Sequence, residues 1–401
     1  MQKLGGVLIL MKNVNYLIGS ENITTSPLVT YNDEVCKFLN DLSSEILKSS
    51  ISRVYPDLSA VAFWARKASI HKLKEKFGDT SNRTGRGLCF HIAPSNIPVN
   101  FAFSYFFSLL AGNANIVRLP SKDFPQTEEL VKVIKNTLEK YPSIYKRTAF
   151  VKYERNNEVT SEFSKIADCR MIWGGDKTIS ILRMMETKPR CIDISFADRY
   201  SICIIEGQEV LEADDSAIKR LAENFYNDTY LMDQNACSSP KLIYWVNDSE
   251  LARTKFWTAV LEIAKQKYQL QDAVAVDKYT KMCEDSIDNS SLISKIDRVD
   301  NLLYKAELRI INKDVQNLRG NGGYFYEYSL SNIEDLFNIV DEKYQTVTYY
   351  GIDAQKLAND VANHNLKGID RIVPIGKAMD IEPYWDGHDI IRELSREIAV
   401  R

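Results

Sequence analysis

The chain has 401 residues, of which 45% are hydrophobic and 26% charged, so it can bury a sizeable globular core. Its formal net charge of -3 offers no basic field for nucleic acid or an anionic membrane surface. The seven cysteines are scattered and form no CxxC pair. This usage argues against a disulfide scaffold or structural zinc and favours a reducing, cytoplasmic location.

The first predicted elements are a buried strand at 5–11 and helices within 33–78. The apolar stretch at 5–11 is too short for a signal-peptide core and no cleavage site follows it. Apolar residues recur at three- and four-residue spacing within 33–78, which ends in Gly78. The longest apolar run, 100–112, is shorter than the ~20 residues that a bilayer span needs. It predicts a buried helix and no membrane span.

Strands and helices then alternate as far as residue 207. Strands are predicted at 87–94, 115–120, 148–153, 169–175 and 200–207, and helices at 99–111, 127–141 and 176–185. This alternation is typical of an α/β fold with a parallel, doubly wound sheet. Such sheets bind ligands at the carboxyl ends of their strands.

A second α/β unit is predicted after residue 207. Helices are expected at 217–232, 252–268 and 390–398, and a strand at 241–246. The mixed polar segment 270–345 gives no clear pattern. The chain is therefore predicted to divide into residues 1–206, 207–375 and a C-terminal segment, 376–401.

Cys237 stands out as a candidate nucleophile. It lies in the sequence DQNACSSP, between a predicted helix and a predicted buried strand. A thiolate is a strong nucleophile when it is held in a polar, partly open site. The neighbouring amides and hydroxyls could hydrogen-bond an anionic sulfur or a substrate. A polar turn that happens to contain a cysteine is the alternative interpretation.

Asn96 lies in the rigid turn APSNIP, between a buried strand and a buried helix. An amide there could donate to a developing oxyanion. Considered alone, Asn96 is more easily explained as a helix cap.

Two strand ends offer groups that suit a phosphate or a ribose. Arg118, Ser121 and Lys122 follow one strand, in the sequence VRLPSKD. Gly174 and Gly175 lie between a strand and a helix, where the backbone can approach a ligand. Each place is equally compatible with an ordinary exposed turn. No metal site is predicted, because the four histidines are far apart in sequence and show no ligand spacing.

Taken together, APSNIP, LLAGNANIVRLPS, IWGG and Cys237 occur in an order that resembles the aldehyde dehydrogenase superfamily. More narrowly, DQNACSSPKLIYW, MIWGGDKTI, KYQTVTYYGI and GIDRIVPIG…YWDGHDIIREL resemble the acyl-CoA reductases of the LuxC type. The resemblance runs from about residue 85 to the end of the chain. It implies an aldehyde dehydrogenase-like fold, in which a doubly wound cofactor-binding domain is followed by an α/β catalytic domain.

The resemblance also implies a role for each candidate residue. Cys237 would accept the acyl group, and Asn96 and the Cys237 backbone N–H would stabilise the oxyanion. The cofactor-binding residues would be Arg118, Ser121, Lys122, Gly174 and Gly175. The 376–401 segment would pack back near the active site or an oligomer interface.

The implied activity is reduction of an acyl thioester to the aldehyde through an acyl-cysteine. Arg118 and Lys122 are compatible with a 2′-phosphate, which favours NADPH, with NADH as the alternative. Ser195 stands where the aldehyde-oxidising relatives carry the glutamate that activates water, so hydrolysis of the acyl-enzyme is disfavoured.

The acyl donor is left open between acyl-CoA, acyl carrier protein and an acyl-protein synthetase, and a homo-oligomer is expected. The alternatives are a cysteine acyltransferase or thioesterase, and a non-catalytic binding protein on the same fold.

Overall fold

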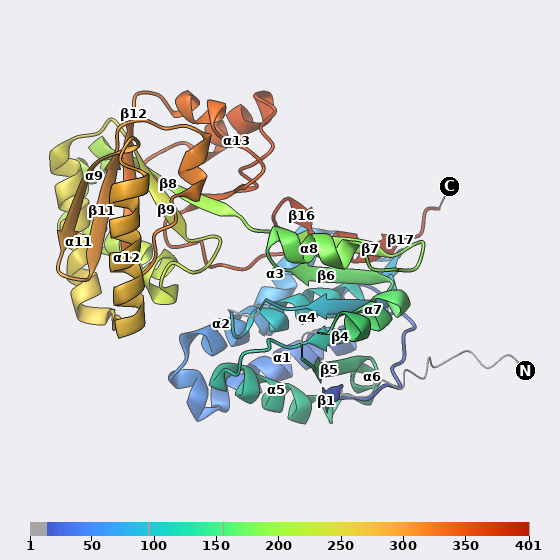
Figure 1. Ribbon diagram of the computed structural model, residues 1–401. Helices are drawn as coiled ribbons and strands as arrows, with labels where there is room; N and C mark the ends of the chain where they lie inside the picture. The colour runs from blue at the N-terminus through green and yellow to red at the C-terminus, as the bar shows by residue number, and fades with distance from the viewer. Residues whose placement is uncertain (1–13, 95–96, 155, 401) are drawn as a thin grey trace, which may run out of the picture. The chain divides into compact units, whose positions relative to one another are not determined.

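The computed structural model describes residues 14–94, 97–154 and 156–400 and divides into two compact units (Figure 1). Unit 1 contains the described residues up to Ala197 and from His388 onward, and unit 2 contains Asp198–Gly387. The predicted strand at 200–207 belongs to the sheet of unit 2. The division expected from the sequence, after residue 206, places this strand in the first domain instead. The strand expected at 5–11 lies outside the described residues.

Unit 1 is built on a six-stranded sheet with the order β1-β5-β4-β3-β6-β7. Only β1 runs antiparallel to its neighbour. The sheet strands are β1 Asn15–Ile18, β3 Leu88–Ile92, β4 Ala114–Arg118, β5 Thr148–Lys152, β6 Cys169–Trp173 and β7 Ile192–Phe196. Chain order reverses at β3, because β4 lies on one side of it and β6 on the other. The predicted doubly wound sheet is therefore confirmed.

The helices of unit 1 pack on this sheet or on one another. They are α1 Asp33–Lys48, α2 Pro56–Ala65, α3 Lys67–Phe77, α4 Asn100–Ala111, α5 Pro125–Leu138, α6 Pro142–Tyr145, α7 Asn157–Ile166, α8 Asp176–Arg183 and α14 Ile390–Glu393, with a 3-10 turn at Ser50–Arg53. Every residue of α4 is buried, as its apolar sequence predicted. Trp64 of α2 packs on three of its aromatic rings. Gly112 ends α4 in the left-handed region, with φ 97°.

The last predicted helix, 390–398, is wrong beyond Glu393. The chain there forms strand β17 Ser395–Glu397, which pairs antiparallel with β2 Arg83–Gly85. Arg83 fixes this pairing, because its buried guanidinium donates to the Ser395 hydroxyl at 3.1 Å and forms an ion pair with Glu397. These side-chain contacts favour an extended backbone over another helical turn.

Unit 2 contains a seven-stranded sheet with the order β10-β11-β12-β9-β8-β13-β14. Only β10 is antiparallel to its neighbour. The strands of this unit are β8 Tyr200–Glu206, β9 Pro240–Val246, β10 Ile293–Val299, β11 Leu303–Leu308, β12 Tyr324–Leu330, β13 Tyr344–Tyr350, β14 Arg371–Pro374 and the short β15 Tyr384–Trp385. The segment 270–345, which had no predicted pattern, supplies several of them.

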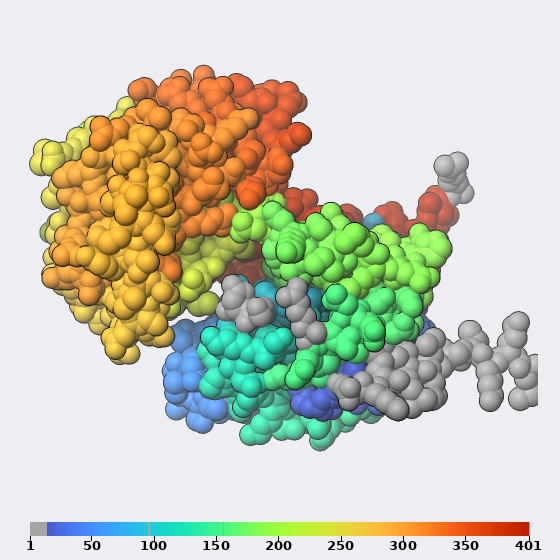
Figure 2. All heavy atoms as spheres, in the orientation of Figure 1, coloured from blue at the N-terminus to red at the C-terminus, as the bar shows by residue number. Residues whose placement is uncertain are grey.

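Helices cover the sheet of unit 2 as well. They are α9 Gly207–Glu212, α10 Asp215–Asp228, α11 Glu250–Lys267, α12 Asp272–Asp288 and α13 Ala354–Asn363, with 3-10 turns at Tyr230–Met232, Lys313–Asn317 and Ile333–Asn338. Helix α12 lies on the surface of this unit (Figure 2). Over the described parts of the chain, no helix combines the length and apolar character that a bilayer crossing requires.

Candidate active site

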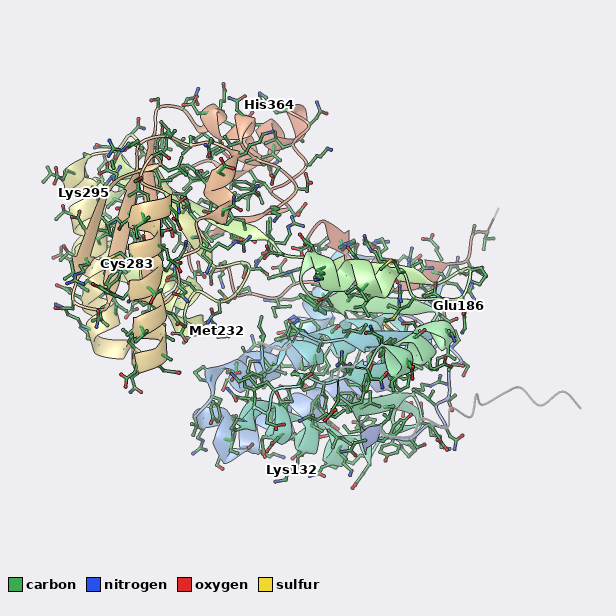
Figure 3. The ribbon with its side chains drawn as sticks, viewed as in Figure 1. Lys132, Glu186, Met232, Cys283, Lys295 and His364 are labelled. Atoms are coloured by element: carbon green, nitrogen blue, oxygen red, sulfur yellow. The ribbon has the colours of Figure 1, made fainter. Side chains whose placement is uncertain are left out.

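Cys237 lies in a tight connection between the 3-10 turn that ends at Met232 and strand β9 (Figure 3 labels Met232). Asp233 and Gln234 both have positive φ, at 50° and 56°, which turns the chain back toward the sheet. The buried Gln234 side chain then accepts hydrogen bonds from the backbone N–H groups of Gly323 and Tyr324 at 2.8 and 3.1 Å. The cysteine loop is thereby tied to the start of β12.

The polar neighbours of Cys237 hold the backbone of the loop. Ser239 donates to the carbonyl of Asp228 at 2.8 Å. Ser201, at the start of β8, donates to the carbonyl of Cys237 at 2.6 Å. The amides and hydroxyls that the sequence suggested as partners of the sulfur therefore include residues, such as Gln234 and Ser239, whose hydrogen bonds go to the backbone instead.

The sulfur of Cys237 has a different donor, which sequence reasoning missed. The side-chain amide of Gln345 donates from Nε2 to Sγ at 3.4 Å, and the same nitrogen donates to a carboxylate oxygen of Asp386. Gln345 is only 1% exposed, and Cys237 is half-buried. The site thus gathers a thiol, an amide and a carboxylate from three separate parts of the chain.

Local backbone conformation places Asp386 at this site. Asp386 and Gly387 have φ values of 50° and 76°. An Asp-Gly pair in which both residues have positive φ is typical of the tight turns that connect two short strands. Those strands are β15 and β16 His388–Asp389. In the sequence, Asp386 lies within YWDGHDIIREL, a stretch that contributed to the family resemblance but did not mark this side chain.

The environment of Cys237 keeps it in the thiol form. Burial raises the pKa of Cys237 to about 11, and the charge of Asp386 adds to this effect. The hydrogen bond from Gln345 and the charge of Arg199 lower the pKa and only partly offset the increase. In the protein alone, the sulfur is therefore protonated at neutral pH.

A buried lysine lies on the strand that follows the cysteine loop. Lys241 is 8% exposed and donates to the carbonyls of Gln234 and Gly320. The pKa of Lys241 is lowered to about 7, mainly by burial and in smaller part by the positive charge of Arg319. Since both of its hydrogen bonds go to backbone carbonyls, Lys241 fixes the loop around Cys237.

The buried carboxylate of Asp228 ties a second loop to this region. It accepts hydrogen bonds from the backbone N–H groups of Gly376 and Ala378 at 2.5 and 2.9 Å. Burial raises the pKa of Asp228 to about 7, and the charge of Asp380 adds to the increase, whereas the two N–H groups and Arg371 oppose it.

This raised pKa predicts a pH-dependent stability. The folded chain retains the Asp228 proton between pH about 4 and 7, whereas the unfolded chain releases it near pH 4. The contribution of Asp228 to the stability of the folded state is complete below pH about 4 and is lost as the pH rises through about 7. Relative to Asp228→Asn, the free energy of unfolding of the wild type should fall by about 3 kcal/mol over this range in urea titrations.

Asp214→Asn is the matched control for this experiment, because Asp214 is an exposed helix cap and asparagine caps equally well. Its pH profile should follow that of the wild type. Parallel profiles for the wild type and Asp228→Asn would contradict the assignment.

The predicted cofactor residues lie at the carboxyl edge of the unit 1 sheet. Arg118 ends β4, Ser121 and Lys122 follow it, and Gly174 and Gly175 follow β6. Strand β3 pairs with both β4 and β6, so these groups flank the point at which the chain order reverses. This is the region where doubly wound sheets bind ligands.

Two features of this edge leave room for an anionic ligand. The Arg118 guanidinium lies 4.6 Å above the Tyr153 ring, and its buried Nε has no hydrogen-bond partner within the described chain. A Cβ atom built on Gly175 would meet no atom within 4 Å, so the backbone before helix α8 is open to a ligand. Anions are stabilised near a helix N-terminus.

Three further residues bear on the sequence predictions: Asn96, Ser195 and His91, one of the four histidines. Asn96 lies outside the described residues. The hydroxyl of Ser195, on β7, accepts a hydrogen bond from Arg183 at 3.2 Å. His91 is fully buried between Ser104 and Asn115, and burial lowers the pKa of His91 to about 4. Across 14–94, 97–154 and 156–400, no group of three or more His, Cys, Asp or Glu residues could hold a metal ion.

Comparison with known proteins adds family information. A family model described as acyl-CoA reductase (LuxC) matches residues 30–397. A long-chain acyl-protein thioester reductase from Aliivibrio fischeri is 23% identical over 308 residues, which cover 73% of this chain and 58% of that protein. Its counterpart from Vibrio harveyi is 22% identical over 327 residues, which cover 78% and 63%. The chain thus spans about three fifths of the length of these relatives.

Solved structures with a similar fold include several aldehyde dehydrogenases. The NADP-dependent glyceraldehyde-3-phosphate dehydrogenase from Bacillus halodurans C-125, complexed with NADP, gives a TM-score of 0.58 at 13% identity, covering 91% of this chain and 86% of that one. Lactaldehyde dehydrogenase from Escherichia coli gives 0.58 at 12% identity, covering 85% and 78%. The predicted α/β, aldehyde dehydrogenase-like fold is confirmed.

Proposed function

The chain belongs to the LuxC family of acyl-CoA reductases, and from this premise we propose that it reduces an acyl thioester to an aldehyde through an acyl-cysteine at Cys237. The observation that carries the proposal is the placement of the Cys237 thiol. It is half-buried in a loop that hydrogen bonds hold in place, and it accepts a hydrogen bond from Gln345. Fatty acyl-CoA is the proposed donor, with acyl carrier protein or an acyl-protein synthetase as the other thioester sources.

In the first step, the sulfur of Cys237 attacks the thioester carbonyl. A new carbon–sulfur bond forms, the bond to the departing thiol breaks, and the proton of Cys237 leaves with that thiol. One thioester replaces another, so the exchange is nearly balanced in free energy. Because burial raises the pKa of Cys237, the attacking thiolate has to form during this step, and the departing thiolate is the acceptor that balances the proton.

In the second step, the acyl carbon is reduced. A nicotinamide cofactor, when bound, supplies a hydride to this carbon. The backbone N–H of Cys237 and the amide of Asn96 would donate to the oxyanion, and one such donor typically accounts for about 10²–10³ in rate. Collapse breaks the carbon–sulfur bond, releases the aldehyde, and returns a thiolate that takes up one proton.

NADPH is the proposed cofactor, held by Arg118, Ser121, Lys122, Gly174 and Gly175. Arg118→Ala and Lys122→Ala should each raise the KM for NADPH about 10- to 100-fold, because a charge-assisted bond to a phosphate contributes about 1.5–3 kcal/mol. The KM for NADH should rise much less. Initial rates with each cofactor check this, with the exposed Lys146→Ala as control. Equal effects on both cofactors would exclude a 2′-phosphate contact.

The proposed activity is tested by incubating the protein with a panel of acyl-CoAs and NADPH. We expect loss of NADPH absorbance, one aldehyde per NADPH consumed, and acylation of Cys237 when NADPH is omitted, observed by peptide mass spectrometry. Release of free acid without NADPH consumption would favour a thioesterase. Neither acylation nor turnover would favour a non-catalytic binding protein.

Assembly and location remain predictions. We propose a homo-oligomer, which light scattering on the purified protein would detect. The cytoplasmic location proposed from cysteine usage would be checked by fractionating cells of the source organism.

A further inference from the structure

The orientation of the Gln345 side chain is set by its partners. Its nitrogen lies between the sulfur of Cys237 and a carboxylate oxygen of Asp386. Its oxygen lies 3.3 Å from the hydroxyl of Thr346, which donates to it. An ionised carboxylate can only accept hydrogen bonds, and an amide NH₂ offers two hydrogens. The contact with Asp386 therefore requires the NH₂ end of Gln345 to face the sulfur.

Gln345 and the carboxylate that accepts from it are both held by the surrounding structure. Gln345 is 1% exposed and lies where β13 shifts its register against β8, between Tyr344, which pairs with β8, and Thr346, which pairs with β14. Asp386 occupies a turn in which it and Gly387 have positive φ. Gln345 therefore has a fixed direction before any substrate arrives, and a donor fixed in this way costs little reorganisation during a reaction.

We propose that Gln345 and Asp386 are a positioning pair for Cys237: Asp386 orients the Gln345 amide, and the amide holds the sulfur in the direction from which it attacks the acyl carbon. This inference rests on the proposed function for the identity of the reaction. It assigns to Gln345 a role that none of the candidate residues from the sequence carried. The amide is also neutral, so it stands next to the sulfur without acting as a base for water.

The charges around the sulfur define how the pair can be tested. Asp386, from the turn after β15, opposes the thiolate, and Arg199, which precedes β8, favours it. Lys241 on β9 and Arg371 on β14 also interact electrostatically with Cys237. Removing the Asp386 charge should make the thiolate easier to form. If Asp386 also orients Gln345, the same change should slow the acyl transfer.

Easier thiolate formation together with slower acyl transfer would show that Asp386 orients Gln345. A purely electrostatic role would give easier thiolate formation without the slower transfer. In Asp386→Asn, the pH midpoint for alkylation of Cys237 by iodoacetamide should fall by about one unit, because a nearby like charge typically shifts a pKa by about this much. The kcat for acyl-CoA reduction should nevertheless fall about tenfold, the scale of one ordinary hydrogen bond, with KM little changed. Peptide mass spectrometry follows Cys237 separately from the other cysteines.

Gln345→Glu provides the second arm. A carboxylate beside the sulfur should raise the alkylation midpoint by at least one unit and lower kcat further than Asp386→Asn does. The matched control is Asp341→Asn, because Asp341 accepts from Gln316 at 3.0 Å in a pair of the same kind. This variant should leave both the midpoint and kcat unchanged.

An unchanged alkylation midpoint in Asp386→Asn, or an unchanged or increased kcat, would overturn the positioning pair. Alkylation needs no acyl substrate, so it reports on Cys237 even if the wild type reduces no acyl-CoA. In that event, the proposed function fails while the predicted shifts in the midpoint can still be observed. Thermal unfolding of each variant verifies that it is folded.

Discussion

Cys237→Ala is expected to lower acyl-CoA reduction about 10³-fold or more, because loss of a covalent nucleophile removes the pathway that depends on it. Covalent labelling by acyl-CoA should disappear from the peptide that contains residue 237. The fold should survive, since the hydrogen bonds of the loop are made by its backbone and by Ser201, Ser239 and Gln234. NADPH consumption and peptide mass spectrometry measure the two effects, and thermal unfolding measures the third.

Cys283→Ala is the matched control. Cys283 is also a half-buried free thiol and lies on helix α12 (labelled in Figure 3). Its replacement should leave both labelling of residue 237 and NADPH consumption at wild-type levels. If Cys237→Ala still consumes NADPH with acyl-CoA at a comparable rate, Cys237 is not the acyl acceptor.

Arg170→Ala is expected to destabilise unit 1 by about 3–5 kcal/mol, the usual result of removing one partner from a buried ion pair. Arg170, on β6, is 2% exposed and forms a bidentate pair with Asp193 of β7 at 2.7 and 2.6 Å. It also donates to Ser164 and to the carbonyl of Leu182, at 3.1 and 2.9 Å. The substitution would leave a cavity and an unpaired carboxylate at the same place. Urea titration measures the loss.

Two further variants separate charge from packing in this experiment. Arg183→Ala removes a guanidinium whose hydrogen bond to Ser195 is exposed, so stability should change by no more than about 0.5 kcal/mol. The double variant Arg170→Met, Asp193→Leu should recover much of the loss, because apolar pairs often replace buried ion pairs without cost. If Arg170→Ala unfolds at the same urea concentration as the wild type, the pair contributes nothing.

The sequence predicted the parts of the fold in which apolar periodicity matches burial. Helix α4 is the clearest example, because its apolar run is buried throughout. The expectation that apolar residues mark the buried face fails for helix α12, at 272–288. This helix buries Lys278 and Asp285. Its Val276 and Ile287 are 63% and 75% exposed. Asp285 is satisfied by the hydroxyls of two strand tyrosines, a contact that no local pattern reveals.

The candidate site was predictable only in part, for the same reason. Cys237 could be singled out because an unusual local sequence surrounds it. Gln345 could not, because its contact with the sulfur joins residues 108 positions apart. Its one signal was the stretch KYQTVTYYGI, which carried the family resemblance without pointing to any side chain. The long separation explains why local chemistry suggested Gln234 and Ser239 instead.

The insertion of unit 2 within unit 1 has a consequence for biosynthesis. Unit 1 is completed only when the chain from His388 returns, since Asn113 and Arg86 donate to the carbonyls of Leu394 and Glu393 at 2.9 and 2.5 Å. At about 5–20 residues per second, the ribosome needs roughly ten seconds or more to make the intervening unit. During that interval, strand β2 has no partner in β17. We therefore expect the later-made unit 2, which is continuous in sequence, to finish folding first, and the nascent unit 1 to be the part that recruits chaperones.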